Sequence, residues 1–184
     1  MSDSAINTAD VAIVRGVAED AGELAAFAAR SFSESFSDQN NPDDMREHLA
    51  KNYGPEQQSA ELADASVITL MAKTDTETVA YAQVRDRQPP ACVDAPNPIE
   101  LHRFYVDRRA HGTGLAAELM QEALAAAAEL GGSHVWLGCW ERNARAIAFY
   151  KKHGFADVGT TYYMVGPDRQ TDRVLVASLM RRDH

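Results

Sequence analysis

The stretch Glu100–Phe155 reads ELHRFYVDRRAHGTGLAAELMQEALAAAAELGGSHVWLGCWERNARAIAFYKKHGF, and its pattern decides the fold. Two apolar runs, Leu101–Val106 and Val135–Trp140, have the length and composition of strands. A long helical pattern separates them, and a shorter one begins at Asn143 and ends at Gly154. The order strand, turn, helix, strand, helix predicts an α/β unit whose chemistry lies at the first turn.

That turn has the composition of an anion-binding site. Arg109, Gly112 and Gly114 form R-x-x-G-x-G, and Arg108 adds a second cation. Glycine allows the backbone to approach a ligand closely. The helix that follows offers N–H groups without intrahelical partners and a partial positive charge at its first turn. We therefore expect the turn to bind a pyrophosphate.

Two other nucleotide-binding motifs fit this turn less well. A P-loop requires a lysine after its last glycine, and Leu115 stands there instead. A Rossmann fingerprint should follow the first strand of its unit, whereas about 100 residues precede this turn. Dinucleotide binding remains a distant alternative.

Two segments, taken together, resemble a known family. Residues 109–114, RAHGTG, resemble the acetyl-CoA pyrophosphate loop of the GNAT N-acetyltransferases. Residues 143–155, NARAIAFYKKHGF, resemble the family's second signature, N-x-x-A-x-x-F-Y-x-x-x-G-F, in the usual order and at the usual separation. The flanking segments VWLGCWE, SFSESF and NNPDDM are similar to those of bacterial small-molecule acetyltransferases of the spermidine/spermine type.

This resemblance implies a fold and a cosubstrate. The fold would be one α/β (α+β) domain over residues 1–184, with a mixed, mostly antiparallel sheet of about seven strands and about four helices. Strands four and five would splay apart, and acetyl-CoA would bind in the splay, its pantetheine arm pairing with the backbone of the fourth strand. The residues implied in cofactor binding are Phe104, Val106, Arg109, Ala110, His111, Gly112, Thr113, Gly114, Leu115, Asn143 and Tyr150.

Acetyl transfer to an amine requires the amine to be neutral. Alkyl amines titrate near ~10.4, so holding one neutral near pH 7 costs roughly 4–5 kcal/mol, and a general base should help. Because side chains alternate along a strand, Glu100, His102, Phe104 and Val106 are expected to share one face. Glu100 also falls where the histone-acetylating branch of the superfamily carries its glutamate base. We expect Glu100 to be the general base, acting through a water, with His102 as the alternative.

The short second helix is expected to reach the thioester sulfur. Asn143 and Tyr150 are two helical turns apart, which places them on one face at a separation of about 10 Å. The resemblance implies that Asn143 contacts the cofactor and that the Tyr150 hydroxyl approaches the sulfur. Cys139 could form an acetyl-cysteine, although a small buried side chain is the simpler interpretation. The six histidines show no metal-ligand spacing, so we expect no metal.

Composition restricts the class of protein. The chain has 184 residues, of which 45% are apolar, as in a globular domain. No apolar run approaches the ~20 residues that span a bilayer, the N-terminus lacks the features of a secretory signal, and Cys92 and Cys139 suggest no disulfide framework. These features predict a cytoplasmic protein without membrane association. The net charge of −9 disfavours nucleic-acid binding and would attract cationic amines, although solubility alone explains it equally well.

The other segments complete the predicted sheet. The expected elements are an edge strand at Val11–Val17, a helix from an Asp20 N-cap to about Phe36, a short helix from Pro42 through Tyr53, a hairpin of Ser66–Ala72 and Thr78–Asp86, a proline-rich loop at Arg87–Pro98, and a last antiparallel pair at Ala156–Val165 and Arg173–Met180. The resemblance implies that the first two helices cover the acceptor site. That would bring four acidic residues near the mouth of the acceptor site: Glu34, Asp38, Asp43 and Asp44. Helix capping and exposure to solvent are the simpler roles for each of them.

The sequence thus predicts an enzyme that transfers an acetyl group from acetyl-CoA to a primary amine of a small molecule, either a polyamine or an amino-acid-like compound. Three alternatives remain: a protein N-terminal acetyltransferase, a CoA-binding module without turnover, and a dinucleotide oxidoreductase. The last strand pair could also form the edge of a homodimer.

Overall fold

One mixed sheet organises the chain. The computed structural model describes residues 6–36, 38 and 40–179. The sheet has seven strands in the order β1-β2-β3-β4-β5-β7-β6, and the β4–β5 pair is parallel while its other neighbouring pairs are antiparallel. The strands are β1 (Ala12–Arg15), β2 (Val67–Lys73), β3 (Thr78–Arg85), β4 (Pro98–Val106), β5 (His134–Trp140), β6 (Ala156–Val165) and β7 (Asp168–Ser178). The predicted fold class is confirmed.

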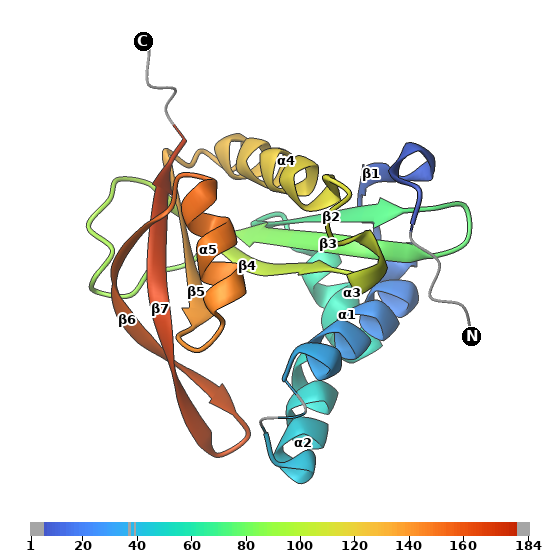
Figure 1. Cartoon of the computed structure of the whole chain (residues 1–184), viewed down its shortest axis with the longest axis horizontal. Coiled ribbons are helices and arrows are strands. Elements are labelled where there is room, and N and C mark those ends of the chain that lie inside the picture. Colours follow the sequence, from blue (N-terminus) through green and yellow to red (C-terminus); the bar gives the residue numbers. More distant parts are fainter. Residues whose placement is uncertain (1–5, 37, 39, 180–184) are drawn as a thin grey trace.

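Helices cover both faces of this sheet. They are α1 (Ala21–Phe36), α2 (Pro42–Asn52), α3 (Pro55–Ala63), α4 (Leu115–Glu129) and α5 (Ala144–Lys152). Figure 1 shows α4 on one side of β2–β4 and α1 and α3 on the other side. The sequence did not predict α3, although Pro55 stands at its first position, where proline is well tolerated.

The α4 face of the sheet carries the larger hydrophobic core. Leu115, Leu119, Ala123 and Ala127 are buried on one stripe of α4, as the helical spacing predicts. This stripe packs against small residues on β3, so the helix lies close to the sheet. Gly131 follows the helix with φ of 85°, a conformation in which glycine commonly ends a helix.

The opposite face is packed by α1 and fastened by a buried arginine. Leu24 and Phe27 of α1 pack against Tyr81 of β3. The Arg103 guanidinium donates hydrogen bonds to Glu61 Oε2 of α3 at 2.5 Å and to the Asn52 carbonyl at 3.1 Å. Because these bonds join β4 to α2 and α3, Arg103 holds the two helices over the sheet.

The first helix begins at Ala21, directly after Asp20 as predicted, but Asp20 does not cap it. A short 3₁₀ turn, Ala18–Asp20, leads directly into α1. The Asp20 carboxylate accepts from the Val17 N–H at 2.9 Å and pairs with Lys73 at 2.9 Å. The prediction of Asp20 as the N-cap is therefore wrong, because its side chain bonds backward along the chain rather than capping the turn that follows.

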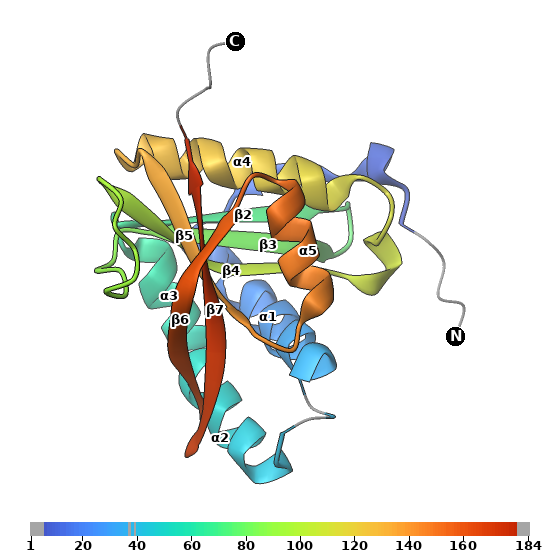
Figure 2. The same cartoon turned by 60° about the vertical axis from the view of Figure 1, so that its left-hand side comes forward.

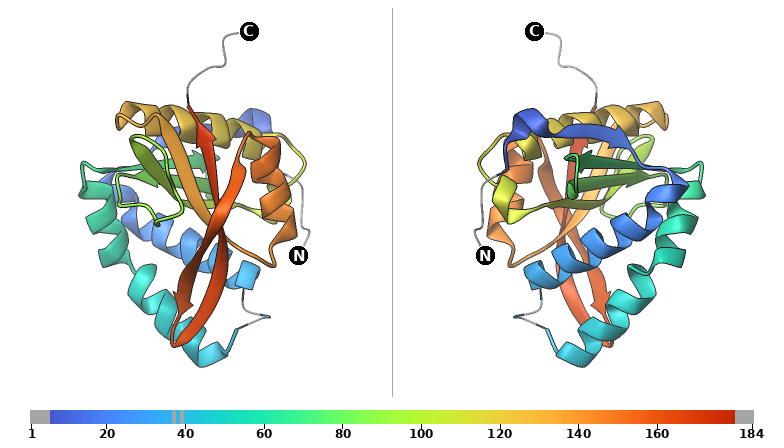
Figure 3. Two further views of the ribbon diagram at one scale, coloured as in Figure 1. Left: turned by 90° about the vertical axis from the view of Figure 1, so that its left-hand side faces the viewer. Right: turned by 90° about the vertical axis from the view of Figure 1, so that its right-hand side faces the viewer.

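The C-terminal hairpin differs from the sequence-based prediction at its second strand. β7 begins at Asp168, five residues before the predicted Arg173, and Met180 lies outside the described residues. Figures 2 and 3 show the twisted β6–β7 hairpin extending past the sheet to α2. The Tyr163 hydroxyl of β6 meets Nε2 of His48 in α2 at 3.1 Å. The hairpin and α2 therefore enclose a space beside the sheet.

Strand β4 contains a β-bulge at His102. Gln83 of β3 pairs with Arg103, but the next β3 residue, Val84, pairs with Leu101. His102 is therefore the extra residue of the pair, and the ordinary alternation of side chains reverses there.

The bulge moves Glu100 to the other face of the sheet. Glu100 pairs with Arg85, which shares its face with Tyr81 on the α1 side, whereas Phe104 pairs with Ala82 on the α4 side. The expectation that Glu100 shares a face with Phe104 and Val106 is wrong, because alternation does not continue through a bulge.

Candidate active site

The cleft of the molecule begins where β4 and β5 separate. The two strands pair only from Pro98 to Glu100 of β4 and from His134 to Trp136 of β5 within the described chain. Beyond these residues the strands diverge and leave a wedge, which confirms the predicted splay. The cleft has a volume of about 1080 Å³ and extends from the wedge to the space beneath α1 and α2.

The edge of β4 that borders the wedge has backbone groups available for a ligand. Asp107 donates its N–H to the Val79 carbonyl at 2.9 Å, so it faces β3. Alternate residues of an antiparallel strand turn their hydrogen-bonding groups to opposite edges. Phe104 and Val106 consequently turn theirs toward the wedge, and Nε2 of His111 meets the Val106 carbonyl at 3.1 Å.

The glycine turn stands at one end of this wedge. Gly112 and Gly114 have φ of 79° and 94°, a region that favours glycine, and α4 begins at the next residue, Leu115. Thr113 donates its hydroxyl to the Ala110 carbonyl at 2.7 Å, which closes the turn. The first N–H groups of α4 lack intrahelical acceptors, so the turn presents them together with the positive end of the helix.

The arginines of the turn have different roles. The Arg109 guanidinium bonds to Asp107 and Glu77, each at 2.9 Å, and these hydrogen bonds raise its pKa. Within the described residues it does not line the cleft, so its side chain anchors the turn to the β2–β3 connection. Arg108 and Arg145 do line the cleft and supply positive charge there.

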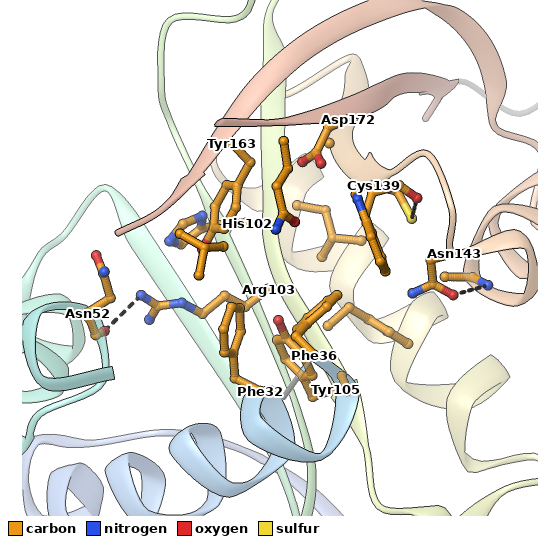
Figure 4. Close-up of a pocket in the computed structure, with 18 of the residues that line it drawn as sticks. Phe32, Phe36, Asn52, His102, Arg103, Tyr105, Cys139, Asn143, Tyr163 and Asp172 are labelled. Carbon is orange, nitrogen blue, oxygen red and sulfur yellow. Dashed lines mark hydrogen bonds between the residues drawn. The ribbon is translucent and has the colours of Figure 1, made fainter. Parts of the chain in front are cut away.

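Helix α5 faces the wedge with Asn143 and Tyr150. Asn143 caps the helix by accepting from the Ala146 N–H at 3.1 Å, which fixes the side chain at the mouth of the wedge (Figure 4). The Tyr150 ring packs against Phe104 and Phe155, at centroid distances of 6.3 and 5.8 Å. Burial raises the Tyr150 pKa, and the nearby Cys139 raises it further, so the hydroxyl stays protonated.

Glu100 is buried in an ion pair. Its carboxylate accepts from Arg85 Nε at 2.5 Å and lies 3.7 Å from His102 Nδ1. Burial alone would raise the Glu100 pKa, but the bonds from His102 and Arg85 prevail and lower it to about 2. Burial lowers the pKa of His102, which is therefore neutral at pH 7. A carboxylate held so firmly as an ion is a weak proton acceptor.

Cys139 has the properties of a packing residue. The side chain is buried, and burial together with the charge of Asp172 raises its pKa to about 12. The thiolate that a covalent mechanism requires is therefore scarce at neutral pH.

Aromatic side chains form the wall of the cleft beneath α1 and α2. Phe36 meets Trp140 at 6.1 Å, and Phe32 stacks on His48 at 4.8 Å. Tyr163 closes this side through its hydrogen bond to His48. Figure 4 shows Phe32, Phe36 and Tyr163 around the same hollow as His102 and Asp172.

Of the four acidic residues predicted near the acceptor site, one lines this cleft in the described chain. Glu34 lines it, but within the described residues Asp38, Asp43 and Asp44 do not. Asp43 pairs with Arg46 at 2.8 Å on the exposed side of α2.

Sequence reasoning missed Asp172, which lies in the cleft with 8% of its surface exposed. No motif surrounds it, because it reaches the site through the pairing of β7 with β5. An isolated aspartate in an alternating strand gives no signal of such a position.

Neither a metal cluster nor a membrane span is found among the described residues. No group of three His, Cys, Asp or Glu side chains in that part of the chain is arranged to hold a metal ion. None of the described helices has the length and hydropathy needed to cross a membrane.

A wedge between parallel strands, with a glycine turn and a helix N-terminus at its end, fits an elongated ligand that carries a pyrophosphate, such as an acyl-CoA. Residues 26–155 match the acetyltransferase (GNAT) family. The chain is 31% identical over 172 residues to an uncharacterized N-acetyltransferase in the pepI 3′ region of Lactobacillus delbrueckii subsp. lactis, covering 92% of this chain and 98% of that protein. It is 35% identical over 164 residues to an uncharacterized N-acetyltransferase of Mycobacterium tuberculosis, covering 88% and 99%.

Solved structures share the fold. The PaiA N-acetyltransferase of Thermoplasma acidophilum, determined in complex with coenzyme A, superposes with a TM-score of 0.73 at 17% identity, covering 91% of this chain and 98% of that one. The chain belongs to the acetyltransferase (GNAT) family. It is an acetyl-CoA-dependent N-acetyltransferase, and acetyl-CoA is its cosubstrate.

Proposed function

We propose that the enzyme transfers the acetyl group directly to a primary amine of a small molecule, either a polyamine or an amino-acid-like compound. One observation carries this proposal: a single cleft joins the wedge on the α5 side to an aromatic and acidic hollow beneath α1 and α2. An amine in the hollow and a thioester in the wedge would meet where β4 and β5 separate. The cosubstrate and the amine would thus approach from opposite faces of the sheet.

The described backbone supports the proposed cofactor contacts. The edge of β4 would pair with the pantetheine arm, and the glycine turn would hold the pyrophosphate. Arg109 contributes its backbone and the rigidity of the turn rather than a free guanidinium. The residues proposed for cofactor binding are Phe104, Val106, Arg109, Ala110, His111, Gly112, Thr113, Gly114, Leu115, Asn143 and Tyr150.

Tyr150 is the proposed catalytic residue at the sulfur. Its raised pKa keeps the O–H proton in place at neutral pH, so the hydroxyl can donate to a sulfur that gains charge as the C–S bond breaks. Glu100, the base expected from the sequence, stays in the proposal in a changed role. It orients His102 through the 3.7 Å contact instead of accepting the proton itself.

A homodimer is also proposed. Among the described residues, strand β6 is the last strand of the sheet and exposes Val158, Tyr162 and Met164. An unpaired edge with apolar side chains is a suitable surface for a second copy. Sedimentation of the protein over a range of concentrations would test this association.

The function can be tested by thiol release from acetyl-CoA in the presence of spermidine, L-lysine and ethanolamine. We expect at least one of these amines to stimulate thiol release, and we expect Tyr150→Phe to lower kcat about 10- to 100-fold. Because the phenyl ring keeps its packing, the acetyl-CoA dissociation constant should stay within about twofold of wild type.

Two outcomes would contradict the proposal. If acetyl-CoA bound but neither amines nor a peptide with a free N-terminus stimulated thiol release, the protein would be a CoA-binding module. If the peptide alone were acetylated, the acceptor class would be wrong while the assignment of Tyr150 could stand.

A further inference from the structure

The carboxylates of the cleft differ in their partners. Five line the cleft in the described chain: Glu34, Glu47, Glu61, Glu100 and Asp172. Glu61 and Glu100 form ion pairs with arginines, and Glu34 and Glu47 are exposed near the mouth. Asp172 is buried, and the structure gives it no ion-pair partner among the described residues. A buried carboxylate without a cation is costly unless a ligand supplies the charge.

A glycine opens the way to this carboxylate. Asp172 pairs with Trp140 across β5 and β7, and Gly138 lies two residues from Trp140 on the same face. A Cβ at Gly138 would stand 3.1 Å from Asp172 Oδ2. Gly138 is exposed although its neighbours along β5 are buried, so the missing side chain leaves the carboxylate accessible from the cleft.

Asp172 and Tyr150 flank the same end of β5. The Cys139 thiol interacts electrostatically with the Asp172 carboxylate and also with the Tyr150 hydroxyl. Cys139 belongs to the core on the α4 side, whereas Gly138 and Asp172 face the aromatic hollow. A proton acceptor therefore lies on one side of the strand and a proton donor on the other.

We propose that Asp172 binds the ammonium group of the acceptor and takes its proton, which makes this enzyme selective for amines that arrive as cations. The inference deepens the proposed function and rests on it. One N–H proton passes to an Oδ atom of Asp172, and the nitrogen lone pair then forms the bond to the acetyl carbon. The C–S bond breaks with its electron pair on sulfur. Nitrogen loses a second proton as the amide forms, and the leaving sulfur gains one proton, so CoA leaves as the thiol. Asp172 then returns the first proton to water.

The charges around Asp172 favour a cation. Burial, and then the charge of Glu141, raise the Asp172 pKa to about 6. Among the described residues, the Cys139 thiol and the Tyr163 hydroxyl also interact electrostatically with it, and both are neutral at pH 7. Asp172 is thus ionised at neutral pH. Its pKa of about 6 makes it a stronger base than Glu100, whose pKa is about 2, by about 10⁴-fold, because each pKa unit is a factor of ten.

His102 is the competing proton acceptor in the same hollow. Burial lowers the pKa of His102, Glu100 raises it, and the positive charges of Arg103 and Arg85 lower it further. Arg85 and Arg103 are already paired with Glu100 and Glu61, so the surroundings of His102 are close to neutral, whereas Asp172 and Glu141 attract an incoming ammonium group. The amine should therefore dock at Asp172 rather than at His102.

The test compares Asp172→Asn with wild type and with Asp75→Asn. Asp75 lies in the exposed β2–β3 turn, away from the cleft, and its replacement makes the same change in net charge. Thiol release is measured with spermidine, L-lysine and ethanolamine between pH 5.5 and 9. We expect Asp172→Asn to lower kcat/KM for the amine at least about 100-fold and to remove the acid limb of its pH profile. Calorimetry should give an acetyl-CoA dissociation constant within about twofold of wild type for all three proteins.

The results separate this inference from the proposed function. If wild type acetylates an amine and Asp172→Asn does so equally well, or if His102→Asn alone abolishes the acid limb, the role of Asp172 is wrong and the function stands. If wild type turns over none of the amines, their binding to the enzyme–CoA complex is measured by calorimetry. Binding to wild type that Asp172→Asn lacks supports the ammonium site, and equal or absent binding overturns it.

Gly138→Ala provides a second variant that leaves the carboxylate in place. Gly138 does not need a positive φ, so alanine fits the strand, but its methyl group would stand against Asp172 Oδ2. We expect KM for the amine to rise several-fold while acetyl-CoA binding is unchanged. An unaltered KM would show that the amine does not approach past Gly138, which contradicts the proposed path.

Discussion

The thiol of Cys139 lies beside the wedge, yet its environment makes it a poor nucleophile. Its pKa of about 12 leaves only a minute thiolate fraction at pH 7.5, and direct transfer needs no thiolate. We expect Cys139→Ala to keep kcat within about threefold of wild type and to lose about 1 kcal/mol of stability, because a small buried group is removed. Mass spectrometry of the wild type after mixing with acetyl-CoA should detect no acetylated cysteine. A variant without activity would restore the covalent route.

Single residues differ in how far the sequence reveals them. The placing of Asn143 and Tyr150 at one cleft could be predicted, because one short helix carries both and local spacing fixes their relation. Asp172 could not, since its position depends on the register of β7 against β5, which joins segments 32 residues apart at Trp140 and Asp172. The sequence did not predict that Arg85 pairs with Glu100, because that contact also depends on the register of two strands.

At the scale of elements, the bulge in β4 is the feature that the pattern of residues concealed. An alternating apolar and polar run gives no sign of one extra residue, so the predicted face of Glu100 was wrong while those of Phe104 and Val106 followed from the ladder beyond it. The strand–turn–helix unit, in contrast, was predictable because its glycines, helix stripe and loop length are all local.

The turn before α4 permits a direct test of its backbone. Gly114 has φ of 94°, and an alanine in the left-handed region costs roughly 1–2 kcal/mol. We expect Gly114→Ala to lose about that much stability and, since the N-terminus of α4 would shift, to weaken acetyl-CoA binding at least about tenfold. Urea unfolding and calorimetry would measure the two effects.

A matched glycine controls for the substitution itself. Gly22 lies in α1 with open space where a Cβ would stand, so Gly22→Ala should be neutral or stabilise the protein by up to about 1 kcal/mol. Acetyl-CoA binding should not change. Equal acetyl-CoA affinity in both variants would argue against a pyrophosphate site at the turn.

For the whole molecule, the fold class was predictable because residues 109–114 and 143–155 resemble the two signatures of a family whose fold is known. The closure of the cleft was not, since it arises where α2 and the β6–β7 hairpin meet through Tyr163 and His48. These elements are more than 100 residues apart in sequence. Long-range pairing of this kind leaves no periodic signal in either segment.

The two buried carboxylates of the cleft should affect global stability in opposite directions. Folding raises the Asp172 pKa from 3.8 to about 6, so between these values the native state binds more protons than the unfolded state. Stability attributable to this group is therefore lost as pH rises from about 4 to 6, and by pH 7.5 the loss is up to about 3 kcal/mol. Asp172→Asn should thus be more stable than wild type at pH 7.5, by up to that amount, and gain nothing near pH 4.

Glu100→Gln serves as the opposite case. Folding lowers the Glu100 pKa from 4.5 to about 2, so its contribution is present above about pH 4.5 and is lost as pH falls toward 2. The variant should lose about 3 kcal/mol at pH 7.5, because Arg85 stays buried without its partner. Urea unfolding of both variants at pH 4 and 7.5 measures these changes. Where a protein keeps a charge buried for a cationic ligand, removing that charge is expected to raise stability and lower activity. If Asp172→Asn were instead less stable than wild type at pH 7.5, the Asp172 carboxylate would already have its partners within the fold.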